Sequence, residues 1–98
     1  RFLASRSLQP VAISIVVLAE FAEGFEDVRP VEAFCARFKI VLLSRAIAYR
    51  CAEMQRKLPQ RLGENDGWVA ATALVYGAEL VGRERAFGRV PRLHYTSF

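Results

Sequence analysis

The sequence predicts an α/β fold with a mostly parallel sheet, and three observations lead to that expectation. Residues 11–17 form an uninterrupted, mainly β-branched apolar run, which is typical of a strand buried on both faces of a parallel sheet. Stretches with apolar residues at helical spacing follow it, separated by further short apolar runs. No repeat or linker interrupts this alternation, so we expect one domain at residues 1–98.

Caps and helix breakers place the elements of the first half. After the opening strand, we predict a short helix at 18–25 with Gly24 at its end. Pro30 suits the first turn of the next helix, at 30–38, because a helix does not need the N–H that proline lacks there. A short apolar strand is expected at 40–43.

The second half contains a long helix and a second strand–helix alternation. Ser44 is a good N-cap, and Pro59 stops the helix that lies between these two residues. Beyond it we predict a loop, a helix, a strand and a final short strand, at 62–66, 66–77, 79–82 and 93–96.

Composition narrows the class of protein. The net charge is +4 with a pI of about 9.6, and arginine supplies all but two of the 14 basic residues. Such a surface favours nucleic acid or an acidic partner. The longest apolar stretch is too short to span a bilayer. Cys35 and Cys51 are expected to be buried, reduced thiols of a cytoplasmic protein, and the single histidine, His94, argues against a His-rich metal site.

Three acidic residues are predicted to meet at one edge of the sheet. Glu20 lies in the first helical turn after the opening strand, Asp66 at the start of the helix at 66–77, and Glu84 just beyond the next strand. Helix starts and strand ends share the carboxyl edge of a parallel sheet, where open α/β sheets bind ligands. We refer to Glu20, Asp66 and Glu84 as the acidic triad.

Carboxylates gathered in this way suggest a metal site. Like charges that lie close together repel one another unless a cation accompanies them. Oxygen ligands suit Mg²⁺ or Mn²⁺, and such an ion can activate water against a phosphodiester. Arg83 and Arg85 flank Glu84 and are candidates for binding the phosphate of a substrate.

Each of these residues also has a simpler interpretation. Asp66 could serve only as an N-cap, which is the most frequent role of aspartate at a helix start. Glu20 and Glu84 could be helix-end or surface acids. Arg83 and Arg85 could be solvated surface charges. The placement of three separate acids on one edge favours the metal site.

Two segments resemble a known family. Residues 63–98 (GENDGWVAATALVYGAELVGRERAFGRVPRLHYTSF) are similar to the C-terminal half of PIN-domain nucleases, particularly bacterial VapC-type toxins. The family pattern there is an acid at a helix start, then W-I-A-A-x-A, L-V-(S/T)-R-(D/N)-x-x-F and R-V-P-x-L. Residues 14–24 (SIVVLAEFAEG) resemble the family segment S-x-x-T-x-x-E-x-x-x-G. The two matches have the correct order and spacing and cover most of the chain.

The resemblance implies a fold, an activity and partners. It implies a three-layer α/β/α PIN-like fold and a Mg²⁺- or Mn²⁺-dependent endoribonuclease. The acidic triad matches the second, third and fourth acids of the family, and these residues would hold the metal and carry catalysis. The resemblance further implies a homodimer and a VapB-like antitoxin, which commonly places a basic side chain among the acids.

The sequence departs from the family pattern at three points. The family's first, central strand and its acid have no counterpart, so the chain is expected to lack that strand and to be truncated at its N-terminus. Gly82 stands where the family usually has Ser or Thr, and Ala86 replaces a second acid often found two residues after the position of Glu84. The loss of an acid is expected to weaken the metal site.

Three hypotheses follow. The leading one is a VapC-like ribonuclease in which metal-activated water hydrolyses an RNA phosphodiester. The second is an inactive PIN remnant that acts by binding an antitoxin or another PIN protomer. The third is a basic RNA-binding module without catalysis, whose affinity would be salt-sensitive and independent of metal.

Overall fold

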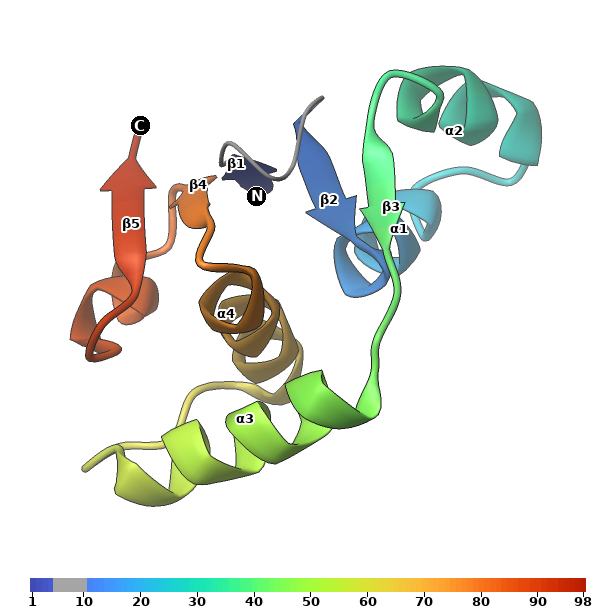
Figure 1. The fold of residues 1–98 in the computed structure, drawn as a ribbon. Helices are drawn as coiled ribbons and strands as arrows, with labels where there is room; N and C mark the ends of the chain where they lie inside the picture. Colours follow the sequence, from blue (N-terminus) through green and yellow to red (C-terminus); the bar gives the residue numbers. More distant parts are fainter. Residues whose placement is uncertain (5–10) are drawn as a thin grey trace.

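The computed structural model describes residues 1–4 and 11–98 (Figure 1). Its elements are, in chain order, β1 (Phe2–Ala4), β2 (Ala12–Ser14), α1 (Ile15–Ala22), α2 (Val28–Cys35), β3 (Lys39–Val41), α3 (Arg45–Lys57), α4 (Glu64–Tyr76), β4 (Glu79–Gly82), the 3₁₀ helix η1 (Arg85–Arg89) and β5 (His94–Ser97). Strands and helices alternate through most of the chain, as the sequence predicts.

The five strands form one mixed sheet in the order β3-β2-β1-β4-β5. The pairs β2–β3 and β4–β5 are parallel, whereas β1 runs antiparallel to both of its neighbours. Four strands therefore point the same way, which confirms the expected mostly parallel sheet. The expected absence of a central strand is wrong for the described chain, because β1 fills the place between β2 and β4. Leu3 of β1 is buried in the core, and its backbone partners on β4 include Leu80.

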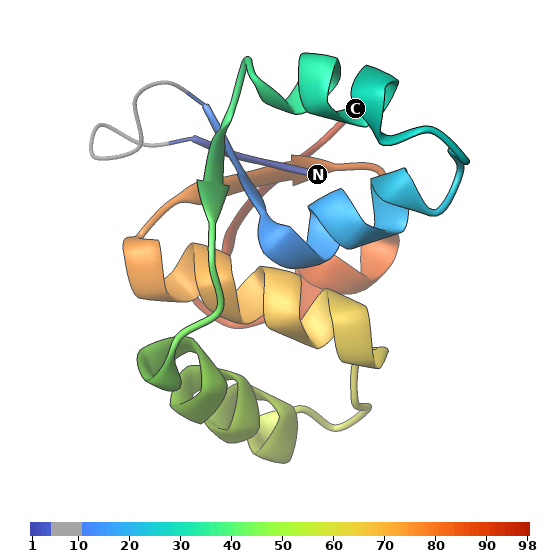
Figure 2. The same cartoon turned by 90° about the vertical axis from the view of Figure 1, so that its right-hand side faces the viewer.

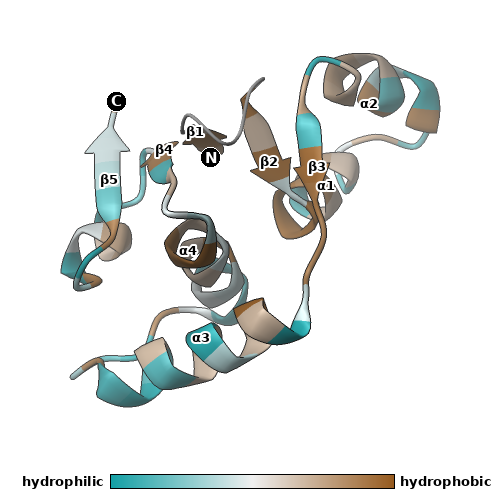
Figure 3. Ribbon diagram, in the orientation of Figure 1, coloured by the Kyte–Doolittle hydropathy of each residue, from teal (hydrophilic) through white to brown (hydrophobic). Residues whose placement is uncertain are grey.

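The two faces of the sheet carry different layers. Figure 2 shows α4 beneath the strands with α3 beyond it, and α2 on the opposite side. Because side chains alternate along a strand, Leu3 joins the core cluster around α4, while Phe2 packs against Phe38 in the turn between α2 and β3, with 5.2 Å between ring centroids. Figure 3 shows α3 alternating between hydrophobic and hydrophilic residues, as expected of a helix with one buried face. The arrangement is the expected three-layer α/β/α fold.

The boundary between β2 and α1 differs most from the sequence-based expectation. The predicted strand at 11–17 is too long, because the helix already begins at Ile15. Ser14 causes this early start: its Oγ accepts a hydrogen bond from the Val16 N–H at 3.1 Å and so caps the helix. The cap outweighs the strand preference of the β-branched residues that follow.

Other boundaries shift by a few residues. The helix expected at 30–38 begins at Val28, since Asp27 caps it by accepting from the Arg29 N–H at 3.0 Å. The Ser44 cap and the strand at 79–82 are as predicted. Both cysteines are free, but only Cys51 is buried, whereas Cys35 is half-buried. Within residues 1–4 and 11–98, no helix has the length and apolar character needed to cross a bilayer.

A side-chain clamp on α3 fixes the start of α4. Gln55 is buried; its Nε2 donates to the Leu62 carbonyl at 3.1 Å, and its Oε1 accepts from the Leu62 N–H at 2.9 Å. Gly67 in the first turns of α4 lets the helices approach, because a Cβ there would lie 2.4 Å from Gln55 Nε2. This contact sets the position from which α4 presents Asp66.

We expect Gly67→Ala to lower the free energy of unfolding by about 1–3 kcal/mol, because the added methyl group displaces the Gln55 amide from Leu62. Urea denaturation measures this change. The matched control is Gly88→Ala, where a Cβ meets nothing within 4 Å and the effect should stay below about 1 kcal/mol. In a Gln55→Ala background the cost of Gly67→Ala should shrink, and an undiminished cost would contradict the proposed clash.

Candidate active site

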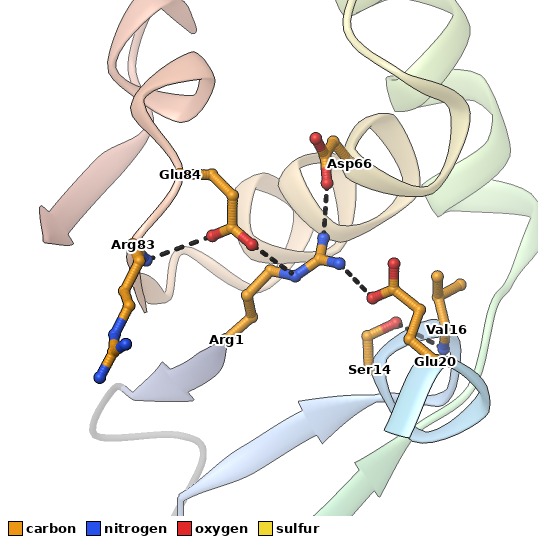
Figure 4. A network of polar contacts seen from close by, with 7 residues as sticks. All are labelled: Arg1, Ser14, Val16, Glu20, Asp66, Arg83 and Glu84. Atoms are coloured by element: carbon orange, nitrogen blue, oxygen red, sulfur yellow. Dashed lines mark hydrogen bonds and ion pairs between the residues drawn. The ribbon is translucent and has the colours of Figure 1, made fainter. Parts of the chain in front are cut away.

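The acidic triad converges on the guanidinium of Arg1 (Figure 4). Arg1 Nη1 lies 2.6 Å from Asp66 Oδ1, and Nε lies 3.4 Å from Glu84 Oε1. Nη2 forms a further ion pair with Glu20. Three carboxylates from three separate elements thus surround one cation, and the structure brings together the three acids that the sequence placed on one edge.

Glu20 reaches this edge from the second turn of α1. The sequence placed it in the first turn, but the Ser14 cap starts the helix earlier and moves Glu20 to its sixth residue. Figure 4 shows Ser14 and Val16 at the start of the helix that carries Glu20. The position of the cap therefore decides the direction in which this carboxylate points.

Asp66 is the third residue of α4, so the interpretation that it serves only as an N-cap is wrong. Gly63 occupies the cap position, and no side-chain hydrogen bond caps this helix. Asp66 and Glu64 both lie in the first turn, where the helix dipole favours negative charge. The dipole allows a carboxylate there, and the Arg1 guanidinium directs that of Asp66 toward the site.

Glu84 lies two residues beyond the end of β4 and immediately precedes η1. Its Oε2 accepts a hydrogen bond from the Arg83 N–H at 3.2 Å, which leaves Oε1 directed at Arg1. The Arg83 side chain points away from the acids in Figure 4, and its guanidinium lies 4.9 Å from the ring centroid of Phe98. Arg85, in η1, is exposed. The structure therefore places neither predicted phosphate-binding arginine among the carboxylates.

Sequence reasoning missed the role of Arg1. Its side chain is only 13% exposed, less than those of the acids it contacts, and its Cζ lies 5.9 Å from the ring centroid of Phe87. Arg1 immediately precedes β1 and lies two residues before Leu3, so both point to the face that α4 covers. No local motif signals this placement, which depends on the pairing of β1 with a strand from the other end of the chain.

Tyr95 is the second residue that sequence reasoning missed. Its hydroxyl oxygen is buried and has no hydrogen-bond partner among the described residues. Burial raises the pKa of the Tyr95 hydroxyl, the negative charge of Glu84 raises it further, and Arg1 opposes the shift. The hydroxyl therefore keeps its proton at neutral pH and remains a hydrogen-bond donor.

The triad offers the kind of donor atoms that a divalent metal ion would need, and in this structure the Arg1 guanidinium lies among them. Three carboxylates offer the oxygen donors that Mg²⁺ and Mn²⁺ prefer. Arg1 lies between the three carboxylates in this structure. The described part of the chain accordingly has no group of three or more His, Cys, Asp or Glu side chains placed so that it could hold a metal ion. A metal ion and the Arg1 guanidinium would occupy the same space, so the donor set fits a metal only when Arg1 withdraws.

Fold and site together define the class of this protein as an α/β domain with an acidic site at the carboxyl edge of its sheet. The PIN-domain family model matches residues 1–93. The chain belongs to the PIN-domain family, whose members are generally nucleases that use divalent metal ions. A search of curated proteins found no match.

Solved structures show the same fold in toxin–antitoxin complexes. One similar chain belongs to VapBC2 from Rickettsia felis, in a structure bound to a DNA fragment from the VapBC2 promoter. The similarity has a TM-score of 0.77 and 26% identity, over 89% of this chain and 74% of that one. A chain of VapBC-1 from nontypeable Haemophilus influenzae matches with a TM-score of 0.72 and 23% identity, covering 88% and 72%. A chain of a toxin–antitoxin complex from Klebsiella pneumoniae has a TM-score of 0.71 and 24% identity, over 84% of this chain and 70% of that one. These similarities confirm the VapC-type resemblance.

We expect Arg1→Ala to destabilise the protein by about 1–3 kcal/mol, because it leaves three carboxylates without their common cation. Millimolar Mn²⁺ should then raise the melting temperature of this variant more than that of the wild type, since no guanidinium competes for the carboxylates. Thermal melting with and without Mn²⁺ measures both effects. Arg29→Ala is the control, because Arg29 pairs with Asp27 on the exposed surface. An equal response to Mn²⁺ in all three proteins would show that the acids do not hold the ion.

Proposed function

We propose that this protein is a VapC-like, metal-dependent endoribonuclease whose acidic triad holds Mg²⁺ or Mn²⁺. The observation that carries the proposal is the convergence of three carboxylates, from α1, α4 and the end of β4, on a single cation. One carboxylate already balances the charge of one arginine, and gathering two more at the same place costs repulsion. Carboxylate oxygens are the ligands that hold divalent ions in proteins. Membership of a family of nucleases supports the same assignment.

The residues of the site would have separate roles in metal binding and RNA binding. Glu20, Asp66 and Glu84 would hold the ion, and the Arg83 N–H keeps the Glu84 carboxylate oriented. A bound divalent ion would supply Lewis acidity and activate water for in-line attack on the phosphodiester. The exposed guanidinium of Arg85 would attract the RNA backbone toward this edge, as would Arg83 after leaving Phe98.

The proposal includes a VapB-like antitoxin and a second copy of this chain as partners. Apolar side chains remain exposed on and beside α1 and α2, with exposed fractions of 43% for Phe25, 57% for Val28 and 37% for Phe34. An antitoxin could cover this surface and place a basic side chain among the acids. The triad would bind that side chain as it binds the Arg1 guanidinium. The similar VapBC complexes support the antitoxin partner.

A non-catalytic role is the second candidate, and β1 favours it. This strand brings an arginine rather than an acid into the site, so the carboxylates are neutralised from within the chain. A protein in this state would act by binding an antitoxin or another PIN protomer. The two candidates differ in whether the triad binds metal and cleaves RNA once Arg1 is removed.

We expect Arg1→Ala protein to bind Mn²⁺ and to cleave single-stranded RNA, and Asp66→Asn in that background to lower the cleavage rate about 100-fold, because a misplaced ion no longer aligns the attacking water. Isothermal titration with Mn²⁺ and gel-resolved cleavage of labelled RNA are the two measurements. The amide is isosteric with the carboxylate, so the fold should persist.

The matched control is Glu64→Gln. Glu64 occupies the same first turn of α4 and carries the same charge, but it is exposed and is not among the acids that pair with Arg1 within the described residues. It should leave Mn²⁺ binding and cleavage within about twofold of the parent. Negligible Mn²⁺ binding and cleavage in every variant would exclude the nuclease and leave the non-catalytic role.

A further inference from the structure

The space above Gly82, beside the acidic triad, is lined by groups from three strands or their ends. A Cβ on Gly82 would lie 3.0 Å from Glu84 Oε2, 3.4 Å from Arg1 Cγ and 3.5 Å from the Tyr95 hydroxyl oxygen. These atoms belong to the end of β4, to the residue preceding β1, and to β5 respectively. Tyr95 therefore contributes a hydroxyl to the same small region that contains the Arg1 side chain and the Glu84 carboxylate.

The sheet register explains how a residue from the edge strand reaches this region. Tyr95 pairs with Leu80 in the parallel β4–β5 ladder, and Gly82 lies two residues beyond Leu80 on the same face. The Tyr95 ring packs against Phe87, with 5.4 Å between the ring centroids, and this contact directs it along the face that α4 covers. The absence of a side chain on Gly82 leaves room for the hydroxyl.

The hydroxyl has no function within the fold as described. It is buried, and no described residue accepts or donates a hydrogen bond to it. A buried polar group without a partner costs about 1–3 kcal/mol, so such groups are rare in native proteins and often mark a binding or catalytic site. A tyrosine hydroxyl has one proton to donate, so an acceptor such as a phosphate oxygen would satisfy it.

We propose that the Tyr95 hydroxyl is a substrate-binding group that donates a hydrogen bond to a phosphate oxygen of an RNA strand held at the acidic triad. The inference rests on the proposed nuclease function and adds a residue to its site. A neutral donor suits this place better than another lysine or arginine, because it binds the phosphate without competing with a metal ion for the carboxylates. Withdrawal of Arg1 would open the region above Gly82 to that phosphate.

The test uses Tyr95→Phe, which removes the hydroxyl and keeps the ring that packs on Phe87. Both this variant and its parent carry Arg1→Ala, so that the guanidinium does not block the site. The affinity for a fluorescent single-stranded RNA oligonucleotide is measured by anisotropy in Ca²⁺, which takes similar oxygen ligands. We expect Tyr95→Phe to weaken RNA binding about 10- to 100-fold, as expected for a lost hydrogen bond to a charged group. Tyr49→Phe, on an exposed tyrosine of α3, is the control and should change nothing.

Two further readouts separate substrate binding from a structural role. Mn²⁺ affinity should stay within about twofold, and the melting temperature of the free Tyr95→Phe protein should be equal or higher, because the variant no longer buries an unpaired hydroxyl. Two results would overturn the inference: a lower melting temperature, or a loss of Mn²⁺ affinity equal to the loss of RNA affinity. Either would indicate that the Tyr95 hydroxyl has a structural role in positioning Glu84. Unchanged RNA binding in Tyr95→Phe overturns the inference alone. Failure of the Arg1→Ala parent to bind RNA overturns both this inference and the nuclease.

Discussion

A single guanidinium surrounded by three carboxylates is the constraint on which the arrangement of this site depends. Arg1 joins α1, α4 and the end of β4 through three ion pairs, although these elements lie far apart in the sequence. Each carboxylate is also oriented locally: Glu20 by the Ser14 cap, Asp66 by its place in the first turn of α4, and Glu84 by the Arg83 N–H. These local contacts direct the three carboxylates toward one place, and the positive charge of Arg1 offsets the repulsion between them.

The same interaction gives the site two possible states that exclude each other. With Arg1 in place, the acids are neutralised and their donor atoms are directed at nitrogen. With Arg1 withdrawn, they form a concentrated negative charge that attracts a divalent ion or a basic side chain of a partner. The net charge of the chain is +4, so the acidic triad belongs to a protein whose charge balance is positive.

Much of the fold could be predicted from the sequence, because its signals are local. Ser44, Pro59 and Gly77 define helix ends by their own chemistry, and the strand at 79–82 is as predicted. The edge on which the acids meet could also be predicted, since it follows from the handedness and direction of α/β units. The start of α1 was misplaced because one capping hydroxyl competes with a run of β-branched residues, and the strength of a cap depends on where the helix packs. Arg1 and Tyr95 could not be found, because their roles depend on strand pairings, Phe2 with Val81 and Leu80 with Tyr95, that leave no periodic trace in the sequence.

The antiparallel strand β1 also has a consequence for the order of folding. The pairs β1–β2, β2–β3 and β4–β5 join segments that are nearer each other along the chain, whereas β1 pairs with β4 across most of the length of the chain. Closing so long a loop is entropically costly and slow compared with local pairing. The two halves of the sheet can therefore form separately, β1–β2–β3 with Arg1 and Glu20 and β4–β5 with Asp66 and Glu84, and the β1–β4 pairing joins them last. The step that completes the sheet is then the same step that assembles the carboxylates, so a partly folded chain does not carry the assembled acidic site.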